Sequence, residues 1–173
     1  MRLFFALWPE SSSSQQWQHD LALPTQVLGG RRMPMANLHM TLAFLGEVAG
    51  DRVNTLIALG DDLPRDAISL RFDRIECWKK PELACLRPTE SPTALTRLVG
   101  QLNTGLRLSG FPLEGKTFRP HVTLARHVTT AAPSLPVWPV LEWQVPAIAL
   151  VRSRLTPDGS EYAVLHEWAL ARQ

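Results

Sequence analysis

Apolar residues alternate with polar or small residues in several short segments of the chain, a pattern typical of β-strands. Residues 2–9 (RLFFALWP) place Leu3, Phe5 and Leu7 on one face and predict a half-buried first strand. The same reasoning predicts strands over residues 38–45, 67–78, 82–88, 118–128, 145–155 and 161–170. Apolar residues at helical spacing predict helices over 9–23, 50–63 and 91–110, and Gly110 is expected to end the last one.

The order of these elements predicts an α+β fold with antiparallel sheets, because strands follow one another without regular crossover helices. Residues 129–143 are rich in proline and predict a loop. Two similar segments, around His39 and His121, lie close to half a chain length apart. They predict one bilobal domain over residues 1–173, a duplicated fold with flanking helices and a central cleft between the lobes.

The composition excludes several classes of protein. The 173 residues are 45% hydrophobic and 20% charged, as in ordinary soluble domains. The net charge of +2 is too small for nucleic-acid binding by bulk charge, although a local basic patch can hold a phosphate. No apolar run approaches the ~20 residues that span a bilayer, and the N-terminal segment lacks the features of a signal peptide, so we expect a cytoplasmic protein. The two cysteines, Cys77 and Cys85, are too few for a disulfide framework or a zinc tetrad.

The most informative feature of the sequence is a repeated His-x-Thr-Leu motif. It occurs in NLHMTLAFLG at His39 and Thr41 and in PHVTLAR at His121 and Thr123. Because side chains alternate along a strand, the histidine and threonine of each copy share one face, about 7 Å apart at Cα. A single histidine in an apolar strand is most often a satisfied core residue. Two copies of one pattern favour a functional site in which the motifs face each other across the cleft.

Two imidazoles and two hydroxyls meet the needs of phosphodiester hydrolysis without a metal. Histidine titrates near neutral pH, so one ring can accept a proton from water while the other donates one to the leaving oxygen. The Thr41 and Thr123 hydroxyls can donate to the non-bridging phosphate oxygens. Arg126 could neutralise charge in the transition state, but strict alternation points it away from His121, so this role requires the strand to end or twist there. A zinc site is the alternative, and neither motif offers the further ligands that zinc needs.

These segments resemble the 2H phosphoesterases, and among them the bacterial RNA 2′,3′-cyclic phosphodiesterases, also called 2′-5′ RNA ligases. The resemblance spans nearly the whole chain, since RLFFALWP is similar to the opening strand of the family and LVRSRLTPDGSEYAVLHEWAL to its closing hairpin. It implies a bilobal fold and hydrolysis of a 2′,3′-cyclic phosphate to a 2′-phosphate, with no metal or other cofactor.

The resemblance also implies roles for the motif residues. By position, His39 and His121 would be the acid–base pair, Thr41 and Thr123 the phosphate clamps, and Arg126 a further phosphate or nucleotide contact. Spacing does not show which histidine is the base. The resemblance favours His121 activating water and His39 protonating the leaving 3′-oxygen.

Five further residues have two open interpretations. Phe44 offers a surface on which a base could stack, but strand alternation also fits a core position opposite the first histidine. Family members often carry an Arg-Trp pair upstream of the first motif, where this chain has Arg31 and Arg32; these two could contact RNA or lie in a solvated loop. Arg152 and Arg154 either line the rim of the cleft or face solvent.

Three functions fit these residues. The first is hydrolysis of RNA ends or nucleotides that carry a 2′,3′-cyclic phosphate, tRNA fragments included. The second is 2′-5′ RNA ligation at the same site, which we expect to be weak because an RNA 5′-hydroxyl must compete with water. The third is a non-catalytic module that binds RNA or nucleotide phosphates, for which lysine or arginine would suffice without two intact motifs. We expect a monomer that does not associate with membranes.

Overall fold

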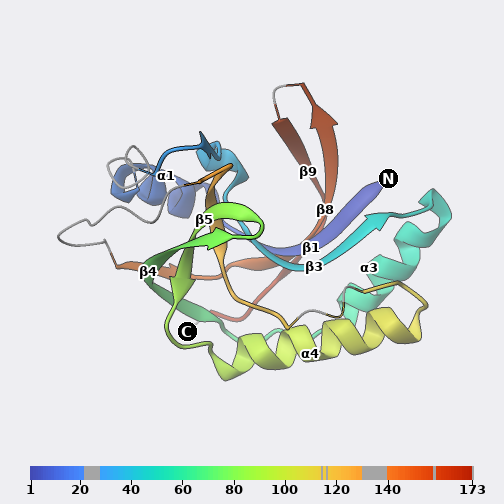
Figure 1. Ribbon diagram of the computed structural model, residues 1–173. Coiled ribbons are helices and arrows are strands. Elements are labelled where there is room, and N and C mark those ends of the chain that lie inside the picture. Colours follow the sequence, from blue (N-terminus) through green and yellow to red (C-terminus); the bar gives the residue numbers. More distant parts are fainter. Residues whose placement is uncertain (22–27, 114, 116, 130–139, 158, 173) are drawn as a thin grey trace.

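The computed structural model describes residues 1–21, 28–113, 115, 117–129, 140–157 and 159–172. It contains antiparallel strands with flanking helices (Figure 1), which confirms the predicted α+β class. The helices are α1 (Ser11–Asp20), α3 (Val53–Asp61) and α4 (Thr93–Leu108), with short 3-10 turns η1 (Met35–Asn37) and η2 (Gly50–Arg52). The strands are β1 (Arg2–Trp8), β2 (Arg31–Arg32), β3 (Met40–Glu47), β4 (Ser69–Lys79), β5 (Glu82–Pro88), β6 (Val122–Arg126), β7 (Leu141–Gln144), β8 (Ala147–Thr156) and β9 (Gly159–Ala169).

The strands form two sheets, and each sheet carries one His-x-Thr-Leu motif. The first sheet has the order β3-β1-β8-β9 and the second the order β2-β6-β5-β4-β7. His39 directly precedes β3 in the first sheet, and His121 directly precedes β6 in the second. The first sheet joins the beginning of the chain to its end, because the predicted closing hairpin β8–β9 pairs with β1. The two sheets therefore do not correspond to two consecutive halves of the sequence.

Strand β1 is buried on both faces, so the prediction of a half-buried strand is wrong. Leu3 and Phe5 lie in the main core, which also contains residues of the second sheet and all three helices. Phe4 and Ala6 point to the opposite face and pack in a separate cluster with Tyr162. The alternation itself is correct, but β1 is a central strand and apolar groups cover both of its sides.

The helices pack their apolar side chains on the sheets. Helix α4 contacts β3 and α3, and α3 contacts β9 (Figure 1). Helix α1 lies against the second sheet, where the Trp17 ring packs edge-on to Trp143 at 5.0 Å. As predicted, α4 ends before Gly110, which has φ of 73° and lies in the left-handed region that glycine favours. The Phe111 amide then donates to the Leu106 carbonyl at 2.9 Å and closes the end of the helix.

Two short strands differ from the sequence prediction. Strand β7 overlaps the end of the predicted loop 129–143, and residues 130–139 of that loop lie outside the described residues. It pairs with β4 because Leu141 and Trp143 bury alternate side chains in the core. Strand β2 was not predicted, since its two residues are both exposed arginines that pair with the end of β6.

Within the described chain, no helix combines the length and apolar character that crossing a membrane requires.

Substitution of alanine for two helical glycines, Gly60 and Gly100, is expected to have opposite effects on stability. A Cβ atom at Gly60 in α3 would overlap the indole of Trp168, which is held in place by a 2.8 Å hydrogen bond to Asp61. We expect Gly60→Ala to lower the free energy of unfolding by about 2 kcal/mol through overpacking. Gly100 in α4 faces open space, so Gly100→Ala should raise it by up to about 1 kcal/mol. Urea unfolding of both variants checks this, and a Gly60→Ala variant as stable as the wild type would contradict it.

Candidate active site

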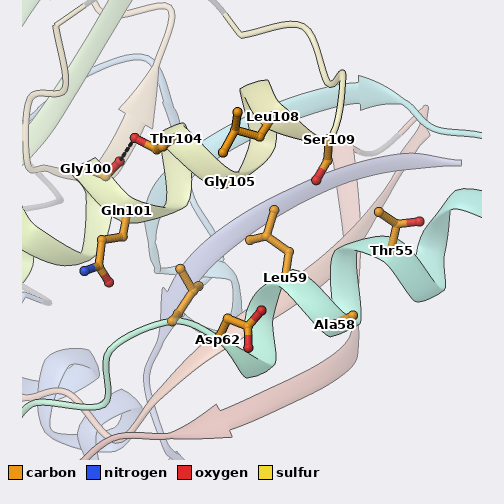
Figure 2. Close-up of a pocket in the computed structure, with 11 residues that line it drawn as sticks. Thr55, Ala58, Leu59, Asp62, Gly100, Gln101, Thr104, Gly105, Leu108 and Ser109 are labelled. Atoms are coloured by element: carbon orange, nitrogen blue, oxygen red, sulfur yellow. Dashed lines mark hydrogen bonds between the residues drawn. The ribbon is translucent and has the colours of Figure 1, made fainter.

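A cavity of about 340 Å³ lies beside the first motif and collects basic, aromatic and hydroxyl side chains. It is lined by Arg2, Phe4, Arg31, His39, Thr41, Phe44, Arg126, His127, Ser153, Leu155, Ser160 and Tyr162. A larger cavity of about 660 Å³ lies between α3 and α4 (Figure 2), but no histidine or arginine is among its described lining residues. The smaller cavity therefore has basic and hydroxyl groups that could bind a phosphate, and a histidine that could transfer protons during a reaction.

Strand β3 contains two extra residues relative to β1, and the first of them directly follows Thr41. Thr41 pairs with Ala6 of β1, and Ala43 pairs with Phe5, so two steps along β3 match one step along β1. Leu42 is the extra residue of this β-bulge. As a result Leu42 and Ala43 are buried one after the other instead of alternating.

Strand β6 contains the same irregularity at the same position of its motif. Thr123 pairs with Cys85 of β5, and Ala125 pairs with Ala84, so Leu124 is the extra residue. Leu124 and Ala125 are again both buried. The repeated letters Thr-Leu-Ala thus have the same backbone arrangement in both sheets.

The bulges reverse the alternation of side chains and correct two predictions. After the bulge, Phe44 and Arg126 lie on the exposed side of their strands, where strict alternation had put the core. Both residues line the 340 Å³ cavity together with His39 and Thr41. Ala43 and Ala125, which strict alternation would place on the same face as the histidines, are instead buried. Phe44 is 38% exposed, so the core position considered for it is wrong as well.

Both histidines make the same hydrogen bond to the backbone. His39 Nδ1 donates to the carbonyl of Asn37 at 2.7 Å, and His121 Nδ1 donates to the carbonyl of Arg119 at 2.7 Å. A carbonyl can only accept, so in each neutral ring the proton resides on Nδ1 and Nε2 is the basic atom. The two motifs therefore present the same nitrogen for chemistry.

His39 sits among aromatic rings. Its ring stacks on Trp8 at 5.1 Å, lies 5.0 Å from Phe4 and meets Tyr162 edge-on at 5.1 Å. The pKa of His39 is lowered to about 4, chiefly by burial and also by the nearby charges of Arg126 and His121, while its backbone hydrogen bond opposes this effect. The neutral Nε2 lies 3.1 Å from Thr41 Oγ1, which donates to it.

His121 has a more ionic environment. Burial lowers its pKa, the hydrogen bond to the Arg119 carbonyl opposes this, and the charges of Arg87, Arg119 and Arg126 lower it further. His121 is half-buried, as is Thr123, and neither lines the 340 Å³ cavity. Two observations connect them to it: strands β3 and β6 are in contact, and the charge of Arg126 acts on both histidines. The charge of His121 also lowers the pKa of His39.

The structure places the remaining predicted arginines in different settings. Arg31 lines the cavity, and Arg32 joins it in lining a neighbouring cavity of about 130 Å³ that also includes Arg126. Arg152 and Arg154 are exposed on the face of β8 opposite Ser153, which lines the cavity. The solvent-facing interpretation of these two is therefore the one that fits.

Sequence reasoning missed seven residues that line the cavity, which are Arg2, Phe4, His127, Ser153, Leu155, Ser160 and Tyr162. Arg2 places its guanidinium 4.9 Å from the centre of the Phe44 ring, and Tyr162 and Trp8 contact His39. Ser153 is buried beside them. One feature of the sequence could have indicated some of them: the second face of RLFFALWP is also apolar, so other side chains must pack on it. Tyr162 and Ser153 could not be predicted, because their positions depend on pairing between strands distant in the sequence. Among the described residues, no three His, Cys, Asp or Glu side chains gather as metal ligands would.

Sequence comparison shows the class to which this fold and site belong. A family model described as LigT like Phosphoesterase matches residues 7–84 and again residues 86–162, and each match contains one motif. The chain belongs to the LigT-like phosphoesterase family, which confirms the resemblance seen in its motifs. It is therefore an enzyme of the hydrolase class.

Individual relatives narrow the comparison within that family. The RNA 2′,3′-cyclic phosphodiesterase of Escherichia coli strain K12 is 30% identical over 99% of this chain and 97% of its own. The protein of the same name from Thermus thermophilus is 32% identical over 98% and 90%. Among solved structures, E. coli LigT complexed with 3′-AMP has a TM-score of 0.85 at 28% identity, and LigT complexed with phosphate a TM-score of 0.82. These two cover 99% of this chain and 98% of their own.

The lowered pKa of His39 predicts a loss of stability in acid. The unfolded ring has a pKa near 6.5 and the folded ring about 4, so the unfolded chain binds the proton more strongly. We expect the free energy of unfolding to fall by roughly 3 kcal/mol from this group as the pH drops from 6.5 to 4. His39→Gln cannot take up that proton and should lose less. Urea unfolding at pH 7 and pH 4 compares the two proteins, and an equal loss in both would contradict the prediction.

Proposed function

We propose that this enzyme hydrolyses 2′,3′-cyclic phosphate ends of RNA or nucleotides to 2′-phosphates, using two imidazoles and no metal or other cofactor. The main support is the geometry that both motifs share. Each sheet presents a histidine whose Nδ1 is hydrogen-bonded to the backbone, and each has a threonine followed by a bulge. The names of the relatives and the structures of LigT with 3′-AMP and phosphate support the substrate class.

In this proposal His39 and His121 share the proton transfers. One neutral Nε2 takes a proton from the attacking water, and the other ring, protonated, gives one to the 3′-oxygen as its bond to phosphorus breaks. We assign the first role to His121 and the second to His39. The bound phosphate is an anion, so it stabilises the imidazolium form that the buried His39 ring otherwise disfavours.

The two threonines act as phosphate clamps. While His39 is neutral, the Thr41 hydroxyl donates to its Nε2. Once that ring is protonated, Nε2 no longer accepts, so the Thr41 hydroxyl can donate to a phosphate oxygen while the Nε2 proton is available to the leaving 3′-oxygen. Protonation of the acid and binding of the phosphate thus reinforce each other. Thr123, at the equivalent position of the second motif, serves the opposite side of the phosphate.

Arg126 and Phe44 complete the substrate site in this proposal. They follow the two bulges at equivalent positions and line the same cavity. Arg126 supplies a fixed positive charge that acts on both histidines. The same charge would attract a phosphate bound between them. Phe44 offers a partly exposed ring for a nucleobase.

We further infer that residues 1–173 form a single bilobal domain that works as a monomer in the cytoplasm. The two successive family matches, each with one motif, support related halves. RNA ends such as tRNA fragments fit this site. Ligation through a 2′-5′ linkage uses the same groups and is expected to be slow beside hydrolysis.

The first test is turnover of 2′,3′-cyclic AMP in excess chelator, followed by phosphorus NMR. We expect a 2′-monophosphate as the product, and a 10²- to 10⁴-fold loss of kcat for His39→Ala and for His121→Ala. Arg152→Ala, on the solvent face, serves as the matched control and should keep full activity. Turnover that disappears with chelator would contradict a metal-independent reaction, and binding without turnover would indicate the non-catalytic module.

The second test is the pH dependence of the reaction. In the free enzyme both histidine pKa values lie below 6.5, with that of His39 about 4. The singly protonated site is most populated between these values, and the catalytic form with the proton on His39 is a fixed fraction of it, so kcat/KM should be bell-shaped with its maximum below pH 6.5. The anionic substrate raises the pKa values, so the maximum of kcat should lie at higher pH. A profile that is flat from pH 5 to 9 would refute paired acid–base histidines.

A further inference from the structure

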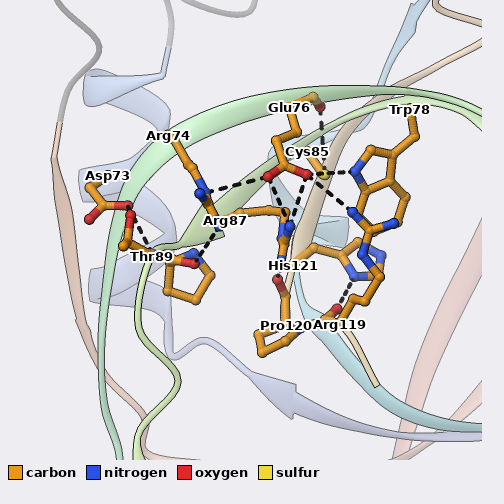
Figure 3. A network of polar contacts seen from close by, with 11 residues as sticks. Asp73, Arg74, Glu76, Trp78, Cys85, Arg87, Thr89, Arg119, Pro120 and His121 are labelled. Atoms are coloured by element: carbon orange, nitrogen blue, oxygen red, sulfur yellow. Dashed lines mark hydrogen bonds and ion pairs between the residues drawn. The ribbon is translucent and has the colours of Figure 1, made fainter. Parts of the chain in front are cut away.

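The Glu76 carboxylate on β4 collects donors from three side chains (Figure 3). Arg87 Nη1 donates to both of its oxygens at 2.8 and 2.9 Å. Trp78 Nε1 donates at 2.8 Å, and Arg119 Nη2 donates at 3.3 Å. Arg74 adds an ion pair at 3.4 Å. A carboxylate with this many charged and neutral donors is held firmly in one place.

Each of the three donors also touches His121 or the residue next to it. The Trp78 ring lies 4.8 Å from the His121 ring. Arg87 Nε donates to the carbonyl of Pro120 at 3.3 Å. The Arg119 carbonyl accepts the His121 Nδ1 proton, and its guanidinium stacks over Trp78 at 4.0 Å. The backbone on the N-terminal side of His121 and one side of its ring are thus tied to the carboxylate.

We propose that Glu76 is a positioning residue for His121, acting through Trp78, Arg87 and Arg119. The carboxylate does not touch the ring itself. It fixes the carbonyl that sets the tautomer of His121 and the indole against which the ring rests, so that Nε2 keeps its direction. This inference rests on the proposed function only for its effect on turnover, since the geometry of the ring can be measured separately.

Glu76 is also the anion paired with Arg87 and Arg119, two of the cations near His121. Beyond the effect of burial, Arg87 from β5, Arg119 from the same segment and Arg126 from β6 all lower the pKa of the ring. His39, from the segment before β3, is coupled to it. Glu76 offsets two of these cations. Burial opposes its ionisation, but its hydrogen bonds and ion pairs together hold its own pKa below the ordinary value. Cys85 lies nearby but stays neutral, because burial raises the pKa of its thiol to about 12.

The two motifs differ in what holds the histidine ring in position. His39 rests among Phe4, Trp8 and Tyr162, and its fixed position comes from apolar packing. His121 has one aromatic neighbour among the described residues, Trp78, and the ion pairs around Glu76 hold that neighbour in place. Removal of the Glu76 charge should therefore affect His121 and leave His39 unchanged.

The test is an NMR titration of the histidine rings in Glu76→Gln, Glu76→Asp and Arg119→Gln. Loss of the Glu76 charge leaves the arginines unopposed, so Glu76→Gln should lower the pKa of His121 by about half a unit or more. Glu76→Asp keeps the charge and should shift it less. Arg119→Gln removes a cation from a half-exposed side chain and should shift it upward. Asp73→Asn is the matched control, because Asp73 is on the same strand but bonds to Thr89.

Turnover of 2′,3′-cyclic AMP gives the second readout. Glu76→Gln should lower kcat by about 10- to 100-fold and change KM less than about threefold, because the phosphate contacts stay in place. Asp73→Asn should match the wild type. If wild-type protein does not turn the substrate over, the proposed function fails while the titration still decides the role of Glu76. The inference is overturned if Glu76→Gln shifts the His121 pKa no more than Asp73→Asn does, or if Arg119→Gln, which tests the network without loss of the carboxylate, shifts it downward.

Discussion

One extra residue directly after the threonine of each motif determines which side chains of β3 and β6 face the site. Leu42 in β3 and Leu124 in β6 interrupt the pairing with β1 and β5. A regular strand would send Phe44 and Arg126 into the core, where a charged group is very costly to bury. The bulges instead keep the leucine and the alanine that follows it inside and turn the next residue outward. An apolar strand can thereby present a histidine, a threonine and a third functional group on its exposed side.

The sequence was sufficient to predict most of the strands and the two motifs that they carry, because these depend on local alternation and on residue type. It was not sufficient to predict the bulges, since an extra residue exists only relative to a partner strand. The second covered face of β1 and strand β7 were missed for a related reason, because their burial depends on segments distant in the sequence. The same holds for the residues Tyr162 and Ser153 in the cavity, which β8 and β9 bring to β1.

The two halves of the site share a backbone design but differ in their surroundings. Both histidines bond Nδ1 to the carbonyl two residues earlier. One then lies among aromatic rings, and the other lies near three arginines. A duplicated motif would by itself give two equal imidazoles, whereas acid–base catalysis needs one donor and one acceptor at the same time. The difference in packing gives the two identical side chains unequal surroundings, as the proposed acid and base roles require.

The position of β1 between β3 and β8 has a consequence for biosynthesis. The chain is made from its N-terminus, yet β1 has no partner on one side until β8 and β9 leave the ribosome. Ser153 and Tyr162, which form one wall of the cavity, are translated after its other lining residues except Leu155 and Ser160. A nascent polypeptide therefore cannot form a complete catalytic pocket, and contacts between its two ends make folding slower than for a helical protein of equal length.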